Sequence, residues 1–242
     1  MMGWRGRIGF LVPPGNPTVE PEMMHLAPRG VSLHFTRMVA HGTTGVHAGQ
    51  EERNRTQIAH LDDNAALLAM VNPGVIVMAH TATSYTLGKE GEAALVARIE
   101  GRHGIRFLTA FATVVEALRH LGVERVAYGT PYDAATTRQG KAHLESHGFS
   151  VVSHGQLPNV SNIYDESEER AYALGRQVDV PQAQAVFLSG VGMPTVGAID
   201  FLERDLGKPV VSSASAMMWS ALRSIGVRDA VPGAGSLLAS PN

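Results

Sequence analysis

The chain has 242 residues, of which 44% are hydrophobic and 17% charged, and its formal net charge at pH 7 is -2. This size and composition predict a folded protein with a sizeable core and exclude a disordered chain. The charge balance, without a concentrated basic face, argues against a nucleic-acid partner. No apolar run is long enough to cross a membrane, and the first residues lead directly into an expected strand. We therefore expect a cytoplasmic protein with no membrane partner.

The chain contains 0 cysteines. This excludes disulfides, thiolate metal ligands and cysteine nucleophiles. Its 11 histidines do not follow a His-Glu-x-x-His or similar ligand spacing, so we predict no metal site. We also expect no cofactor.

Strands and helices are expected to alternate along the whole chain. Short apolar or alternating segments predict strands at residues 7–12, 31–39, 75–78, 105–108, 125–129, 149–152, 185–188 and 209–212. A short helix through Leu26, for which Thr18 could serve as the cap, follows the first strand. Apolar residues at helical spacing predict further helices at residues 56–70, 89–102, 113–121, 134–147, 166–178, 198–206 and 214–225.

This alternation predicts parallel sheets flanked by helices. Similar polar turns follow two of the strands, at residues 80–84 and 189–195. We predict an α/β fold of two similar Rossmann-like (flavodoxin-like) parallel-sheet halves, related by pseudo-two-fold symmetry, with the active site in the cleft between them. The first half comprises approximately residues 1–110 and 213–242, and the second approximately residues 111–212, within a single compact unit.

The stretch from residue 75 to residue 84 is the most informative part of the chain. A buried strand is followed at once by His80, Thr83 and Ser84. Open α/β sheets bind ligands at the carboxyl ends of their strands, so these side chains are candidates for a ligand site. Asn16 follows the first strand in the same way, either as a residue that stabilises its own turn or as an amide that binds a ligand.

Several fragments, in this order and spacing, resemble the aspartate/glutamate racemase superfamily. Within it, the chain is most similar to the branch of maleate cis–trans isomerases and arylmalonate decarboxylases. The resemblance covers nearly the whole chain and is carried by residues 12–20 (VPPGNPTVE), 82–84 (ATS), 112–127 with 130–132 (TPY), 161–163 (SNI), 188–190 (LSG) and 209–213 (PVVSS).

The resemblance also shows what this chain lacks. In the family, one cysteine stands just before a Thr-Ser pair and a second follows a Leu-Ser pair, and the matching positions here are Ala82 and Gly190. The resemblance implies that racemases use both thiols as acid and base, that isomerases use the first as a nucleophile, and that decarboxylases keep only the second as a proton donor. This chain can follow none of these routes.

The anion-binding residues that the resemblance implies are present. Thr83 and Ser84 match donors to a substrate carboxylate or enediolate, and Tyr132 matches a phenol that donates to the same oxygens. The amides of Asn16 and Asn162 match groups that bind a second carboxylate. By the same resemblance, Ala82, Gly190 and Val191 would lie at the substrate. The hydroxyls could instead cap a helix, and Tyr132 could simply pack its ring.

His80 is the main candidate to replace the missing thiols as acid or base. It stands two residues before Ala82, and imidazole titrates near neutral pH. Tyr85 and His41 are weaker candidates at the same rim. Glu20 fits better as a stabilising charge at the start of the first helix than as a base.

The sequence thus predicts a cofactor-independent lyase or isomerase that acts on a small carboxylate or dicarboxylate through an enediolate-like intermediate. Two alternatives remain open. One is a hydrolase or hydratase of an unsaturated or cyclic acid, with a water activated in the space beside Ala82 and Gly190. The other is a non-catalytic carboxylate-binding protein. By resemblance to the family, we expect a homodimer or homotetramer.

Overall fold

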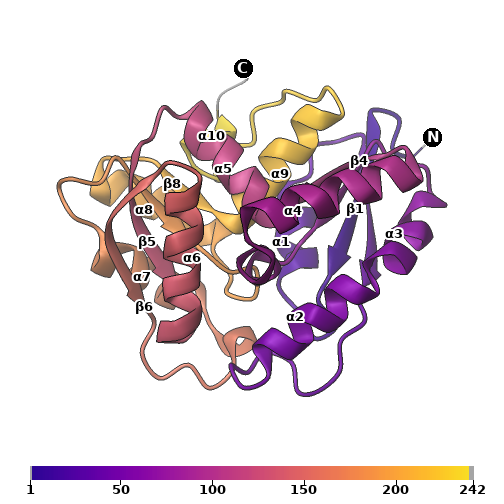
Figure 1. The fold of residues 1–242 in the computed structure, drawn as a ribbon. Helices are drawn as coiled ribbons and strands as arrows, with labels where there is room; N and C mark the ends of the chain where they lie inside the picture. Colours follow the sequence, from indigo (N-terminus) through magenta and orange to yellow (C-terminus); the bar gives the residue numbers. More distant parts are fainter. Residues whose placement is uncertain (1, 240–242) are drawn as a thin grey trace.

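Two parallel sheets form the framework of the computed structural model, which describes residues 2–239 (Figure 1). Their strand orders are β2-β1-β3-β4 and β6-β5-β7-β8. The first sheet contains β1 (Gly6–Val12), β2 (Val31–Arg37), β3 (Val75–Met78) and β4 (Arg106–Thr109). The second contains β5 (Arg125–Thr130), β6 (Ser150–Gln156), β7 (Ala185–Leu188) and β8 (Val210–Ser212).

Helices connect the strands and cover the sheets. Those that begin before the second sheet are α1 (Val19–Leu26), α2 (Gln50–Ala59), α3 (Leu61–Ala69), α4 (Thr81–His103) and α5 (Ala110–His120). The later ones are α6 (Ala134–Ser146), the 3-10 helix η1 (Ile163–Asp165), α7 (Glu168–Val178), α8 (Val196–Leu206), α9 (Ser213–Ser224) and α10 (Ser236–Ala239).

The predicted α/β fold with two similar parallel-sheet halves is confirmed. Every pair of neighbouring strands described is parallel. Both sheets repeat the same order, in which the strand at the edge is the second in sequence, as in flavodoxin-like folds. Because parallel strands end at the same edge of a sheet, the loops after β1 and β3 come together, as do those after β5 and β7.

Three helices differ from the sequence prediction. The helix expected at residues 56–70 begins at Gln50 and breaks at His60 into α2 and α3. The polar turn expected at residues 80–84 forms the first turn of α4, which bends at Gly88, where φ is 66° and ψ is 173°. Helix α5 begins at Ala110, three residues earlier than expected, with the Thr109 side chain as its cap.

The two sheets share one hydrophobic core. Helices α5 and α9 lie side by side, and each of them contacts strands of both sheets (Figure 1). The core includes Val77 of the first sheet and Tyr128 of the second, both fully buried, together with Leu118 of α5 and Met217 of α9. The division of the chain into halves near residues 110 and 212 stays a prediction.

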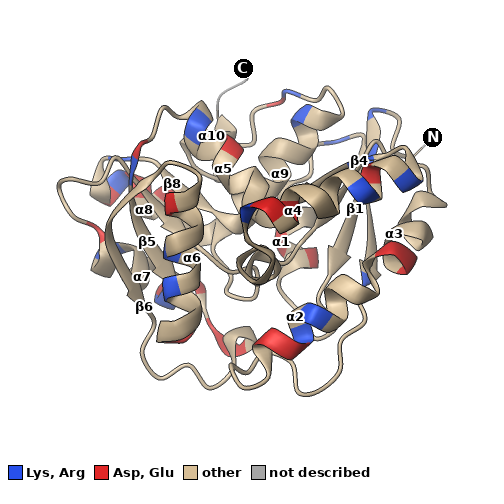
Figure 2. Ribbon diagram, in the orientation of Figure 1, with Lys and Arg blue, Asp and Glu red and all other residues tan. Residues whose placement is uncertain are grey.

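Charged residues are dispersed over the fold. Basic and acidic positions are interspersed along the ribbon in the view of Figure 2, without separation into one basic face. Among the helices of residues 2–239, none has the length and hydrophobicity that crossing a membrane requires.

Candidate active site

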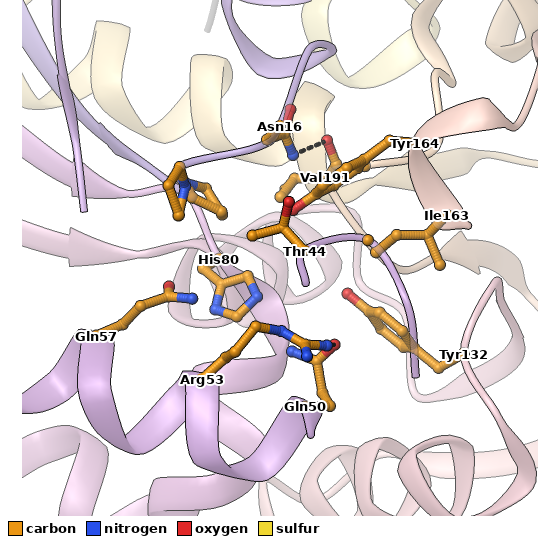
Figure 3. Close-up of a pocket in the computed structure, with 14 residues that line it drawn as sticks. Asn16, Thr44, Gln50, Arg53, Gln57, His80, Tyr132, Ile163, Tyr164 and Val191 are labelled. Atoms are coloured by element: carbon orange, nitrogen blue, oxygen red, sulfur yellow. Dashed lines mark hydrogen bonds between the residues drawn. The ribbon is translucent and has the colours of Figure 1, made fainter. Parts of the chain in front are cut away.

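A cavity lies between the two halves, beside the carboxyl ends of β1, β3 and β7 (Figure 3). The space open to the centre of a water molecule is about 10 Å³, which suffices for about one water. The described residues that line it include a histidine and an arginine but no Asp or Glu: Pro13, Pro14, Asn16, Thr44, Gly45, Gln50, Arg53, Gln57, His80, Tyr132, Ile163, Tyr164, Val191 and Gly192.

The segment before α2 forms part of the cavity wall, with Thr44, Gly45 and Gln50 among its lining residues. It is held to the second half by two hydrogen bonds: Ile163 N donates to Gly45 O at 2.8 Å, and a ring nitrogen of His47 lies 3.1 Å from Pro131 O. Residues 44–50 therefore form a roof over the cavity. A dicarboxylate needs more room than one water, so we expect the roof to move if such a molecule enters.

His80 is the last residue before α4, where it occupies the N-cap position. Its Nδ1 lies 2.5 Å from Thr83 Oγ1, and its ring is buried against the cavity. Burial lowers the pKa of His80 to about 4, with a smaller contribution from the positive charge of Arg53. The imidazole is therefore uncharged at neutral pH, and its Nε2 has no hydrogen-bond partner among residues 2–239.

Arg53 is the charged residue of the described cavity lining that the sequence analysis missed. Its guanidinium donates to Ala48 O at 2.6 Å and to Val46 O. Gln50, Arg53 and Gln57 lie on one face of α2 and point into the cavity (Figure 3). The spacing of three and then four residues was the available signal, but polar residues at helical spacing usually mark an exposed face.

Tyr132 lines the opposite wall with its hydroxyl toward the cavity (Figure 3). Burial raises the pKa of the Tyr132 phenol well above its ordinary value, so the hydroxyl stays a proton-bearing donor at neutral pH. A Cβ atom at Gly190 would lie 3.3 Å from this hydroxyl oxygen and 3.1 Å from Pro131 Cγ. Gly190 also has a φ of 98°, which disfavours any larger residue there.

Asn16 connects the two halves. Its Nδ2 donates to Val191 O at 3.0 Å, and its Oδ1 accepts from Thr18 N at 2.8 Å and from Val19 N at 2.9 Å. Asn16 therefore satisfies the first amides of α1, and the expectation that Thr18 caps this helix with its side chain is wrong. Asn162 has a similar local role, because its Oδ1 accepts from Tyr164 N at 2.9 Å.

Several predicted site residues lie just behind the cavity wall rather than on it. The Ser84 hydroxyl donates to Glu92 Oε1 at 2.6 Å, and Ala82 O accepts from Asn54 Nδ2 at 3.2 Å. Thr83 reaches the cavity only through His80. Four of the nine predicted site residues line the cavity: Asn16, His80, Tyr132 and Val191. The other five do not: Ala82, Thr83, Ser84, Asn162 and Gly190. The assigned roles of all nine stay predictions.

The three weaker candidates also lie outside the cavity lining. The Tyr85 hydroxyl is buried, 2.7 Å from Ser189 Oγ and 3.2 Å from the Tyr128 hydroxyl. His41 is exposed. Glu20 forms an ion pair with Arg37 at the start of α1.

Comparison with known proteins assigns the chain to a family. The model of the arylmalonate decarboxylase family matches residues 8–238. The maleate isomerase of Nocardia farcinica is 34% identical over 98% of this chain and 96% of its own. The chain belongs to the arylmalonate decarboxylase family. The arylmalonate decarboxylase of Bordetella bronchiseptica is 30% identical over 90% of each chain.

Solved structures agree with this assignment. A cysteine-to-serine variant of the Nocardia farcinica maleate isomerase, with a covalently bound succinylcysteine intermediate, has a TM-score of 0.88 at 30% identity and covers 97% of this chain and 98% of its own. A liganded arylmalonate decarboxylase variant, with one cysteine introduced and another replaced, has a TM-score of 0.86 at 26% identity over 96% and 98% of the two chains. The predicted resemblance and enzyme class, an isomerase or lyase, are thereby confirmed.

The contact that holds the roof to Ile163 can be tested by substitutions at two glycines with similar backbone conformations. Gly45 has a φ of 81°, and a Cβ there would lie 1.9 Å from Asn162 Oδ1; Gly42 has a φ of 90° with nothing within 4 Å. We expect Gly45→Ala to break the contact to Ile163 and to speed exchange of the Ile163 amide at least about ten-fold, since local opening controls exchange. Gly42→Ala should leave that amide protected. Equal exchange in the two variants would contradict a roof held at Gly45.

The low pKa of His80 predicts a pH dependence of stability. A histidine with a pKa near 6.5 in the unfolded chain and about 4 in the folded one binds more protons when unfolded. Its stabilising contribution is complete above pH 6.5 and decreases as the pH falls toward 4, by at most about 3 kcal/mol. Urea unfolding of the wild type and His80→Gln at several pH values should show this loss only in the wild type.

The wild-type-minus-variant difference is the quantity to compare, because Glu22 titrates in the opposite sense. Burial raises the pKa of Glu22 to about 7, so its protonated form favours the folded state between pH 4.5 and 7. His154→Gln, at an exposed histidine of β6, is the control. An identical pH slope in the wild type and in His80→Gln would show that His80 does not have a low pKa.

Proposed function

We propose that the protein is a cofactor-independent isomerase or lyase that acts on a small dicarboxylate through an enediolate-like intermediate. The observation that carries the proposal is the charge of the cavity. Arg53 brings a buried positive charge to its wall, and none of the described lining residues is an acid that could neutralise it. The guanidinium is hydrogen-bonded to carbonyl oxygens, which do not neutralise its charge. A buried charge that no opposite charge neutralises is unfavourable, so the cavity favours an anionic ligand.

The helix behind the cavity supports the same ligand. No side chain caps the first amides of α4, where His80, Thr81, Ala82 and Thr83 are buried. The free N–H groups at the start of a helix, together with its dipole, favour a carboxylate. Arg53 and the start of α4 supply two positive regions, which suits an acid with two carboxylates.

The lining favours a small polar substrate over a large aromatic one. Side-chain amides of Gln50 and Gln57 and the Tyr132 phenol face the cavity. The cavity itself is small. We therefore propose a dicarboxylate of a few carbons, with Tyr132 donating to the oxygens on which negative charge develops in the transition state.

His80 is the proposed proton shuttle. As an uncharged imidazole it can accept a proton, and the negative charge of a bound substrate would raise its pKa and stabilise the imidazolium. For a decarboxylation, His80 would first take up a proton from water when the anionic substrate binds. Loss of CO₂ leaves an electron pair on the α-carbon as an enediolate, which takes this proton from the imidazolium and returns His80 to the neutral imidazole. In an isomerisation at a saturated α-carbon, His80 would remove the α-proton to give the enediolate and return a proton to the same carbon. Thr83 fixes the ring orientation.

The absence of cysteine favours proton transfer over covalent chemistry. A maleate isomerase of this family has been captured as a succinylcysteine intermediate, and this chain has no thiol with which to form one. A mechanism that needs only groups that bind carboxylates and one group that transfers a proton therefore fits this chain better than covalent catalysis by a thiol.

The test is turnover of small saturated dicarboxylates such as malonates, followed by proton NMR. Arg53→Gln should raise KM about thirty-fold, because a charge-assisted hydrogen bond contributes about 2 kcal/mol. Arg55→Gln, on the exposed face of the same helix, should leave KM unchanged. His80→Gln should lower kcat about a hundred-fold or more, as loss of a general acid–base does.

The outcomes separate the alternatives. Binding of dicarboxylates without turnover would identify a carboxylate-binding protein instead of an enzyme. Equal KM values for Arg53→Gln and Arg55→Gln would reject the role of Arg53, and turnover by His80→Gln within a few-fold of the wild type would reject the shuttle.

We also propose that the protein is cytoplasmic and forms a homodimer or homotetramer. Large apolar side chains are exposed on the described chain, among them Met24, Met70 and Phe201, which are 62%, 80% and 57% exposed. Contact with a second copy would remove such surface from water. Sedimentation velocity at micromolar concentration should give a mass above the 25.8 kDa of one chain, and a purely monomeric species would contradict this.

A further inference from the structure

A second group of titratable side chains lies outside the cavity, between α4 and α6. Glu92 belongs to α4, His143 to α6, and His147 is the residue that ends α6. Each offers one ligand atom, and these atoms all lie within 4.8 Å of one another. The group therefore joins a helix of the first half to a helix of the second.

The two histidines are presented on one side of α6 by their spacing of four residues. Their ring centroids lie 5.0 Å apart. His143 is buried, and its Nε2 lies 3.3 Å from Glu92 Oε2. Nε2 of His147 is also buried and has no hydrogen-bond partner among residues 2–239. A buried ring nitrogen without a partner is unfavourable unless something else binds it.

Glu92 is oriented by hydrogen bonds on its other oxygen. Ser84 Oγ and Thr109 Oγ1 both donate to Glu92 Oε1, which leaves Oε2 facing the histidines. These donors and His143 lower the pKa of Glu92 against the effect of burial, so it is a carboxylate at neutral pH. Hydrogen-bonded supporting groups of this kind orient the ligands in metal sites.

The group of Glu92, His143 and His147 has an aromatic ring on one side and a surface pocket beside it. The Phe111 ring lies 4.3 Å from the His143 ring, between centroids. A surface pocket of about 310 Å³ reaches His143 beside Gly88. Lys89 and Arg119 donate to the carbonyl oxygens of neighbouring residues at this corner, and they are exposed, so solvent screens their charges.

We propose that Glu92, His143 and His147 bind one divalent transition-metal ion, of which Zn²⁺ fits the donors best. Two imidazole nitrogens and one carboxylate oxygen suit Zn²⁺, with water from the surface pocket as the fourth ligand. Tetrahedral ligands at about 2.1 Å from Zn²⁺ lie about 3.4 Å apart. His143 Nε2 and Glu92 Oε2 are already 3.3 Å apart, and no pair of the three ligand atoms is more than 4.8 Å apart.

The bound ion would act as a clamp between the halves. It would hold α4 to α6, and through Glu92 and Ser84 it would also fix the first turn of α4. The ion does not reach the cavity, since none of its three ligands lines it. It would therefore stabilise the fold and take no part in the proposed reaction.

The experiment is calorimetric titration of untagged, chelator-treated protein with ZnCl₂, together with thermal unfolding. We expect one ion per chain with a micromolar or lower Kd and a higher Tm with zinc than with EDTA. Cobalt substitution should give the visible absorption of a tetrahedral site. His147→Gln, at a half-buried position that leaves the Glu92–His143 contact in place, should weaken binding at least about ten-fold.

Two controls keep this result specific. His154→Gln, at an exposed histidine, should bind zinc as the wild type does. His143→Gln gives a second variant with the same expected loss. The proposal is overturned if the wild type binds no zinc at a 1:1 ratio, or if His147→Gln and His143→Gln bind it as tightly as His154→Gln.

Discussion

The electrostatics of the cleft depend on the positive charge that Arg53 carries into it. That charge is held by carbonyl oxygens of residues 46 and 48, which also belong to the roof of the cavity. The same charge helps to keep the His80 imidazole neutral. One side chain therefore links the roof of the cavity, the protonation state of His80 and the positive charge of the cavity wall.

A second constraint is that both halves must hold their strand ends against each other. Helices α5 and α9 contribute apolar side chains to a core shared by both sheets, and Asn16 adds a buried hydrogen bond to Val191 across the cleft. On another side, Glu92 and His143 join α4 to α6. Because the cavity wall is made by both halves, these contacts determine its shape.

The prediction of the fold succeeded where the sequence signal was local. The buried strand at residues 75–78 is a continuous apolar run, as parallel strands covered on both faces are. The start of α2 was missed because that helix buries polar side chains, Arg53, Asn54 and Gln57, and has no apolar stripe. The start of α4 was missed because small hydroxyl residues after a strand are also typical of a turn.

The sequence by itself determined the α/β class, the placement of His80 and Asn16 at strand ends, and the absence of a thiol. These properties depend on residue identity and on neighbours along the chain. Only the tertiary structure decided that Arg53 lies beside His80, that the Ser84 hydroxyl turns toward Glu92, and that Glu92 meets His143 and His147. Protonation and charge pairing depend on burial and on distances between atoms, and packing brings these residues together from separate helices.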